Sequence, residues 1–191
     1  SLSIAEKLGL NEWLCASIAA GHDLGHVPYG HDGERTLSKL GEKKFEHATN
    51  SVVVAQKVEK LNLTYETLKG FSMHSRGSGE INTIRGEYEE YNLVTYADKI
   101  MYTLSDVDDV TRKKSFERNN ISKLISKLGG NQENMMKNIF DSFINESLKK
   151  GRVSFSEGKI FECFCELRNF MYEEIYSKVD SPLYENILEN I

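Results

Sequence analysis

The stretch AGHDLGHVPYGHDGE, residues 20–34, contains three of the five histidines of the 191-residue chain. An aspartate directly follows the first histidine, and a glutamate ends the stretch. Imidazole and carboxylate groups are ligands that Zn²⁺, Fe and Mn²⁺ take in proteins. Glycines and a proline interrupt regular structure after residue 24, so we expect His26 and His31 to lie on a tight loop. The stretch therefore predicts the floor of a metal site at the end of a helix.

Most of the remaining sequence has helical periodicity. Only two prolines occur, and no run of residues alternates between apolar and polar types between two turns. Gly9 is expected to close a first helix, while Asn11 and Thr64 are expected to cap later ones. We predict an all-α fold with a loop over 76–86 and a short extended piece over 151–155. The expected helices include 34–40, 45–61, 93–110, 116–128, 132–149, 157–178 and 183–190.

Composition limits the class of protein. The net charge is −5, with 39% hydrophobic and 28% charged residues, so we expect no nucleic acid as partner. A few local lysines and arginines still suffice to bind one triphosphate. The three cysteines have no disulfide-framework spacing and fit a reducing cytosol. No apolar run is long enough for a bilayer, and no signal peptide is visible. We expect a cytoplasmic protein without a membrane partner.

A second stretch, LVTYADKIMYTLSD at 93–106, adds acidic residues to a helix. Asp98, Tyr102 and Asp106 follow one another at four-residue intervals and therefore share one helix face. Apolar residues flank Asp98, which favours a buried functional carboxylate. Two structural alternatives remain open: Tyr102 as a half-buried core tyrosine, and Asp106 as part of a solvated acidic face.

These motifs together resemble the HD superfamily, specifically its deoxynucleoside triphosphate triphosphohydrolase branch. The resemblance covers residues 3–110 and is carried by AGHDLGHVPYGHDGE (20–34), FEHATNS (45–51), MHS (73–75) and VTYADKIMYTLSDVDD (94–109). It implies an HD-domain helical bundle. It also implies hydrolysis of a deoxynucleoside triphosphate, at the α-phosphorus, to the deoxynucleoside and inorganic triphosphate. On this basis residues 1–191 form a single domain, with the site in 1–112 and a helical C-terminal extension over 113–191.

The resemblance also implies roles for individual residues and one divalent metal ion, which is Mn, Fe, Zn, Ni or Mg. The implied metal ligands are His22, Asp23 and Asp98. The implied catalytic residues are His31, Glu34 and His47, with the acid orienting the imidazole. The implied substrate-binding residues are His26 and Lys99 at the phosphates, and Tyr102 and Asp106 at the sugar.

The residue types suit this chemistry independently of the resemblance. Breaking a P–O bond in a polyanion requires a cation and hydrogen-bond donors to neutralise charge, and a group that moves protons. His31 and Glu34 are three residues apart, within hydrogen-bond reach on a helix. The alternative for His31 and for His47 is a histidine that caps a helix start. For His74 we expect a structural role at a helix end, next to the helix dipole.

The sequence departs from the family pattern in one respect, and this keeps other functions open. The family's metal tetrad includes a histidine on the helix before the HD pair, and no histidine precedes His22. The resemblance therefore implies that the chain lacks the family's N-terminal segment. The alternatives are an HD-type nucleotide phosphatase or phosphodiesterase, and a catalytically impaired nucleotide-binding regulatory domain. We expect a nucleotide as ligand and at least a dimer.

Overall fold

The computed structural model describes residues 1–41, 43–75, 83–112 and 119–176. All regular secondary structure within these ranges is helical, which confirms the predicted all-α fold. The helices are α1 (Leu2–Leu8), α2 (Glu12–Gly21), α3 (Gly30–Leu40), α4 (His47–Val53), α5 (Tyr65–Met73), α6 (Glu89–Arg112), α7 (Asn119–Leu128), α8 (Gln132–Lys150) and α9 (Lys159–Phe170). Two short π-helical segments, Val54–Val58 and Met171–Ile175, continue α4 and α9.

The helix ends are formed by the residues that the sequence indicates. Gly9 follows α1 in the left-handed conformation with φ 66°, which a glycine adopts without steric cost. Asn11 accepts a hydrogen bond from the Leu14 amide at the start of α2. Thr64 accepts one from the amide of Thr67 at the start of α5. No described helix combines the length and hydropathy that a membrane span requires.

Some predicted boundaries differ from the structure. The predicted helix 45–61 begins at His47 and becomes π-helical from Val54. The segment 151–155, expected as a short extended piece, is not part of a sheet, and hydrogen bonds from Ser154 and Ser156 to Glu146 hold it against α8. The predicted helix 183–190 and most of the predicted loop 76–86 lie outside the described residues.

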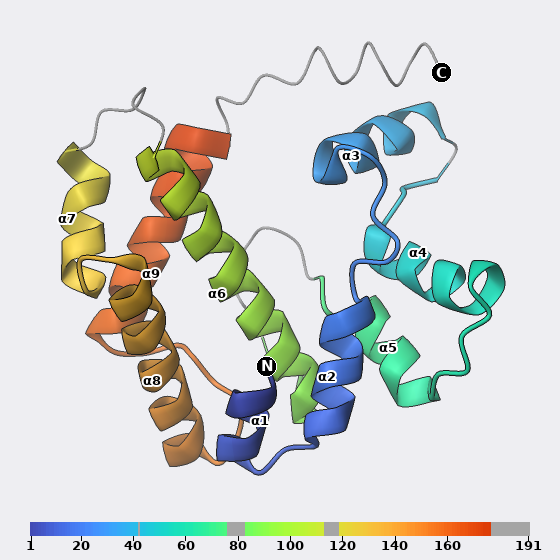
Figure 1. Cartoon of the computed structure of the whole chain (residues 1–191), viewed down its shortest axis with the longest axis horizontal. Helices are drawn as coiled ribbons and strands as arrows, with labels where there is room; N and C mark the ends of the chain where they lie inside the picture. The colour runs from blue at the N-terminus through green and yellow to red at the C-terminus, as the bar shows by residue number, and fades with distance from the viewer. Residues whose placement is uncertain (42, 76–82, 113–118, 177–191) are drawn as a thin grey trace.

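Helix α6 is the central element of the molecule (Figure 1). On one side it packs against α2 and α5, with α4 beyond them, and on the other side against α8, which in turn packs against α7 and α9. Leu93, Ile100 and Leu104 of α6 are almost fully buried, because α6 is covered on several faces. This burial fixes α6 relative to the C-terminal end of α2, where the HD pair lies.

Candidate active site

The loop that carries the HD pair is attached to the start of α4. The Ser51 hydroxyl accepts a hydrogen bond from the Gly25 amide at 2.9 Å and lies 2.6 Å from the His22 carbonyl oxygen. The Asn50 side chain donates to the Gly25 carbonyl at 2.9 Å. A Cβ at Gly25 would lie 2.2 Å from the Ser51 nitrogen and 2.4 Å from the His47 carbonyl oxygen, so only glycine permits this approach. The contact places the loop histidines beside His47.

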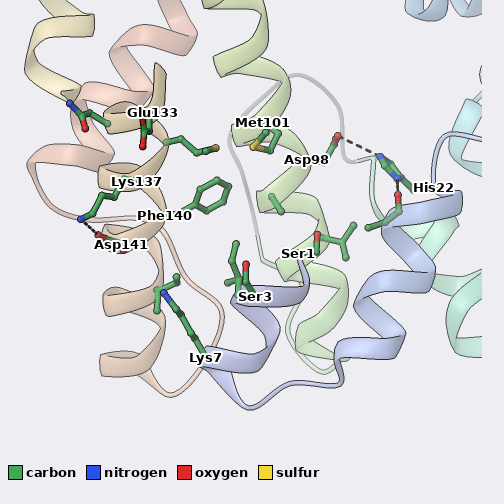
Figure 2. Close-up of a pocket in the computed structure, with 17 residues that line it drawn as sticks. Ser1, Ser3, Lys7, His22, Asp98, Met101, Glu133, Lys137, Phe140 and Asp141 are labelled. Atoms are coloured by element: carbon green, nitrogen blue, oxygen red, sulfur yellow. Dashed lines mark hydrogen bonds and ion pairs between the residues drawn. The ribbon is translucent and has the colours of Figure 1, made fainter. Parts of the chain in front are cut away.

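His22, at the end of α2, faces Asp98 of α6 (Figure 2). The Nε2 atom of His22 lies 3.2 Å from an oxygen of Asp23 and 3.5 Å from an oxygen of Asp98. This Nε2 atom is buried and has no hydrogen bond of good geometry among the described residues. A buried nitrogen between two carboxylates fits a cation bound by all three groups. The three predicted metal ligands therefore lie together, and these residues could hold a divalent ion.

The electrostatic environment of His22 and Asp23 favours a positive charge at this place. Burial raises the pKa of Asp23, but the neighbouring imidazoles, His74 foremost, lower it further, so the pKa is about 2. Burial lowers the pKa of His22, but the two aspartates beside it have the larger combined effect and raise the pKa above its ordinary value. The Asp23 carboxylate thus remains ionised and stabilises a cation beside it.

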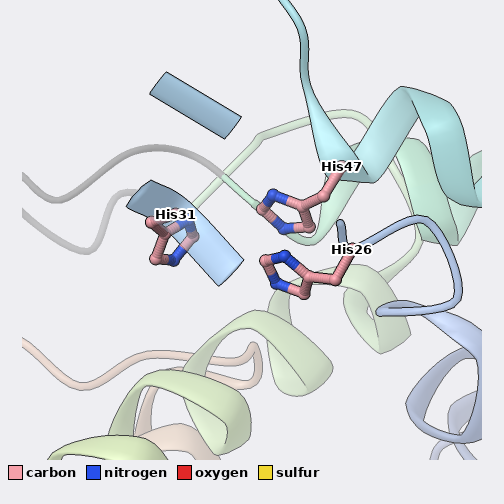
Figure 3. A group of neighbouring side chains, drawn as sticks. All are labelled: His26, His31 and His47. Carbon is pink, nitrogen blue, oxygen red and sulfur yellow. The ribbon is translucent and has the colours of Figure 1, made fainter. Parts of the chain in front are cut away.

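Three further histidines lie next to one another (Figure 3). The rings of His26 and His47 stack with centroids 4.0 Å apart and planes 8° from parallel. His31 meets both rings edge-on at 5.2 and 5.3 Å. The sequence placed His31 on the loop, whereas it lies in the first turn of α3. The difference arises at Gly30, whose φ of 55° lets the chain enter the helix directly after Tyr29.

Glu34 connects two of these histidines. One carboxylate oxygen accepts from Nδ1 of His31 at 3.0 Å, and both oxygens lie 3.1–3.2 Å from Nδ1 of His47. The carboxylate also accepts the backbone N–H of His47 at 2.8 Å. Burial acts to raise the pKa of Glu34, but these hydrogen bonds lower it overall. A charged carboxylate therefore holds both rings with their Nε2 atoms directed away from it.

His74 brings the fifth histidine to the same place from the end of α5. Its Nδ1 lies 2.6 Å from the Phe71 carbonyl oxygen, in keeping with a helix-end histidine. Its Nε2, however, lies 3.2 Å from Nε2 of His47 and 3.6 Å from Asp23. Sequence reasoning gave this residue a structural role alone. The available signal was that His74 lies in MHS (73–75), one of the motifs that carry the family resemblance.

The predicted substrate-binding residues do not all join the histidines. His26 lies among them, 3.4 Å from Asp23. Lys99 is buried on α6 directly after Asp98. Tyr102 and Asp106 lie further along α6 and form a separate cluster with two tyrosines from the C-terminal part of the chain.

The separate cluster joins α6 to the segment after α9. The Tyr102 hydroxyl lies 3.0 Å from the hydroxyl of Tyr172, and the Tyr176 hydroxyl donates to the Asp106 carboxylate. Burial, together with the neighbouring Tyr172, raises the pKa of Tyr102 to about 12. The two C-terminal tyrosines were missed by sequence reasoning, because no local motif marks them.

A cavity of about 680 Å³ adjoins the HD pair on the side of α1 and α8. His22 and Asp98 line one end, and Met101 and Phe140 contribute apolar surface (Figure 2). The volume lies within the range of about 300–1,000 Å³ found for small-molecule sites. Two of the candidate ion ligands, His22 and Asp98, are therefore accessible from a space large enough for a small molecule.

An all-α bundle with a His-Asp pair at a helix end, facing an aspartate of a central helix, is the arrangement of an HD domain. The HD domain family model matches residues 1–103, and the chain belongs to this family. The chain is similar to several proteins described as deoxyguanosinetriphosphate triphosphohydrolase-like. One of them, from Caldanaerobacter subterraneus subsp. tengcongensis, is 35% identical over 99% of this chain and 56% of the relative. Another, in Clostridium tetani, is 38% identical over 91% of this chain and 52% of the relative. A third, in Desulfatibacillum aliphaticivorans, is 31% identical over 99% of this chain and 60% of the relative.

These comparisons confirm the family resemblance noted in the sequence. The chain spans about half the length of the curated relatives it matches.

Proposed function

We propose that this chain is the HD domain of a metal-dependent phosphohydrolase that converts a deoxynucleoside triphosphate to the deoxynucleoside and inorganic triphosphate. The proposal rests on one observation: a set of candidate metal ligands and a pair of histidines held by a carboxylate lie side by side. His22, Asp23 and Asp98 can hold a cation, and a carboxylate-held imidazole pair lies beside them. The names of the curated relatives support the nucleotide substrate.

A divalent ion at His22, Asp23 and Asp98 would neutralise phosphate charge and polarise a P–O bond of the phosphoryl group whose phosphorus is attacked. The protein's own groups then bind and move protons. Because Glu34 accepts the Nδ1 hydrogen of His31, Nε2 of His31 is free to take or return a proton. The His31 side chain is 68% exposed, so a substrate can reach it.

The remaining predicted residues have binding roles in this proposal. His26, beside Asp23, and Lys99, next to Asp98, would contact the phosphates. Tyr102 and Asp106 would contact the sugar from the adjacent turns of α6, with Tyr172 and Tyr176 holding their hydroxyl and carboxylate groups in place. His47 would act close to the scissile bond, held by the same carboxylate as His31.

The test is a turnover assay on the full-length protein with each deoxynucleoside triphosphate and Mn²⁺ or Mg²⁺, with products separated by chromatography. We expect deoxynucleoside and triphosphate, and we expect His31→Ala to abolish them with unchanged thermal stability, because His31 is exposed. Turnover retained in His31→Ala removes this residue from the chemistry. Phosphate released from a nucleoside monophosphate instead indicates a phosphatase. Tight nucleotide binding without products indicates a regulatory domain.

A further inference from the structure

Tyr29 has a strained backbone, and it lies between His26 and His31 in the loop of the proposed active site. Its φ is 68° and its ψ is 16°, in the left-handed region. An L-residue in this region brings its Cβ close to the following carbonyl oxygen, a cost that glycine does not have. A bulky aromatic residue is therefore an uncommon occupant of this conformation.

The strain arises in a tight turn over residues 27–30. The Gly30 amide donates to the Val27 carbonyl at 3.0 Å. Pro28 is the second residue of this turn and Tyr29 is the third. This is the pattern of a type II turn, whose third residue needs a positive φ and is commonly glycine. The turn explains the conformation of Tyr29 but not the presence of a tyrosine, because glycine would adopt it without strain.

Packing on both sides holds the turn in this shape. A Cβ at Gly33 would lie 2.1 Å from the Pro28 carbonyl oxygen, so the turn rests directly on the first turn of α3. On the other side, the Gly25 amide donates to the Ser51 hydroxyl on α4. The backbone at Tyr29 therefore cannot relax without moving one of these helices, and the strain belongs to the folded state.

The Tyr29 side chain adds a second cost. It is 45% exposed, so much of the apolar surface of its ring stays in water. Strained residues cluster at sites that bind ligands, where the strain fixes the position of a functional group. His26 and His31, on either side of Tyr29 in the sequence, have rings 5.2 Å apart in the proposed active site. Tyr29 is thus held at the edge of that site.

We propose that Tyr29 is a substrate-binding residue whose ring packs against the nucleoside part of the nucleotide. In the proposed function the phosphates already have an ion, His26 and Lys99 as partners. An uncharged ring adds little to the binding of a polyanion, whereas its face stacks well on a base or a sugar. This deepens the proposed function and rests on it for the substrate.

The test compares Tyr29→Gly with Tyr29→Phe in full-length protein that also carries His31→Ala, a background expected to bind nucleotide without turning it over. The Kd for dGTP is measured by equilibrium dialysis with Mn²⁺. We expect Tyr29→Gly to raise this Kd about 5–150-fold, the range for loss of one aromatic stacking contact. It should also raise Tm by about 2–4 °C, because the strain is relieved. Tyr29→Phe keeps the ring and should keep both values.

Lys60→Gly is the matched control. Lys60 has a φ of 52° and is exposed, two residues after the π-helical segment Val54–Val58. This substitution is expected to raise Tm as well and to leave the Kd for dGTP unchanged. Inorganic triphosphate is the second control, because it has no nucleoside. Tyr29→Gly should bind triphosphate as tightly as the parent protein does.

Several results would overturn the proposal. An unchanged Kd for dGTP in Tyr29→Gly does so, and so does an equal loss in Tyr29→Phe, because the hydroxyl would then be the contacting group. An equal loss of triphosphate affinity, or a Tm below that of the parent, shows that the tyrosine acts on the phosphate site or holds the fold together. A protein that binds no dGTP overturns both proposals. Binding of dGTP that depends on Tyr29, without any turnover by the wild-type protein, contradicts the proposed function and leaves this inference standing.

Discussion

Glu34 is the residue on which the geometry of two histidines depends. Its carboxylate holds Nδ1 of His31 and Nδ1 of His47, and it also accepts the backbone N–H of His47. Only a group that accepts hydrogen bonds on both oxygens can orient both rings in this way. The carboxylate therefore sets the tautomer of an exposed histidine and of a buried one at the same time.

Glu34→Gln tests this dependence. The amide nitrogen of glutamine donates and cannot accept from Nδ1, so at least one ring must turn or change tautomer. We expect kcat to fall about 10–100-fold, the usual loss when the partner of a site histidine is removed. Glu46→Gln, at an exposed position that pairs with Lys44, is the matched control and should keep wild-type kcat. Equal activity in both variants would show that Glu34 does not orient these rings.

Sequence spacing predicted some of these contacts and not others. The His31–Glu34 bond follows from a separation of three residues on a helix, where side chains are neighbours. The contacts of His47 with Glu34 and with His74 join residues 13 and 27 positions apart. Periodicity describes each helix alone and holds no information on how helices are oriented relative to one another. The site residues were therefore identifiable, but the part of His74 in the cluster was not.

At the scale of elements, the segment after α8 is held by one buried carboxylate. Glu146 accepts hydrogen bonds from Lys150, from the Ser154 hydroxyl and from the backbone and hydroxyl of Ser156. Burial raises the pKa of Glu146, but these donors outweigh burial and lower it to about 2. The carboxylate thus fixes this segment, which includes the extended piece expected at 151–155, against α8.

Because folding lowers the pKa of Glu146, the free energy of unfolding should depend on pH in a known direction. A carboxyl group whose pKa is lower in the folded state stabilises the fold at pH values above its unfolded pKa, and this contribution is lost as pH falls toward the folded pKa. We expect Glu146→Gln to lower the free energy of unfolding by about 2 kcal/mol at pH 7. The difference from wild type should shrink between about pH 4.5 and pH 2 in urea titrations. A difference that is constant over this range would contradict the assignment. Glu133→Gln, on the first turn of the same helix, is the control.

At the scale of the whole molecule, the fold class was predictable because helical periodicity extends through most of the described chain. The meeting of α6 with the segment after α9 was not predictable. Tyr102 and Tyr172 are 70 residues apart, and so are Asp106 and Tyr176. These contacts link the proposed core (1–112) to the proposed extension (113–191), and that division of the chain stays a prediction.

The candidate ion ligands His22 and Asp23 come from the end of α2 and Asp98 comes from the middle of α6, so metal binding should stabilise the packing of these two helices. An ion that binds only the folded state adds about 2.7 kcal/mol when its concentration is 100 times Kd, which raises Tm by about 5–10 °C at this chain length. We expect this rise when Mn²⁺ is added to chelator-treated protein, measured by calorimetry. Asp98→Ala removes a proposed ligand, whose carboxylate lies 3.5 Å from Nε2 of His22, and should lose most of the rise. The same Tm with and without Mn²⁺, or a full rise in Asp98→Ala, would show that these helices are not joined through an ion at Asp98.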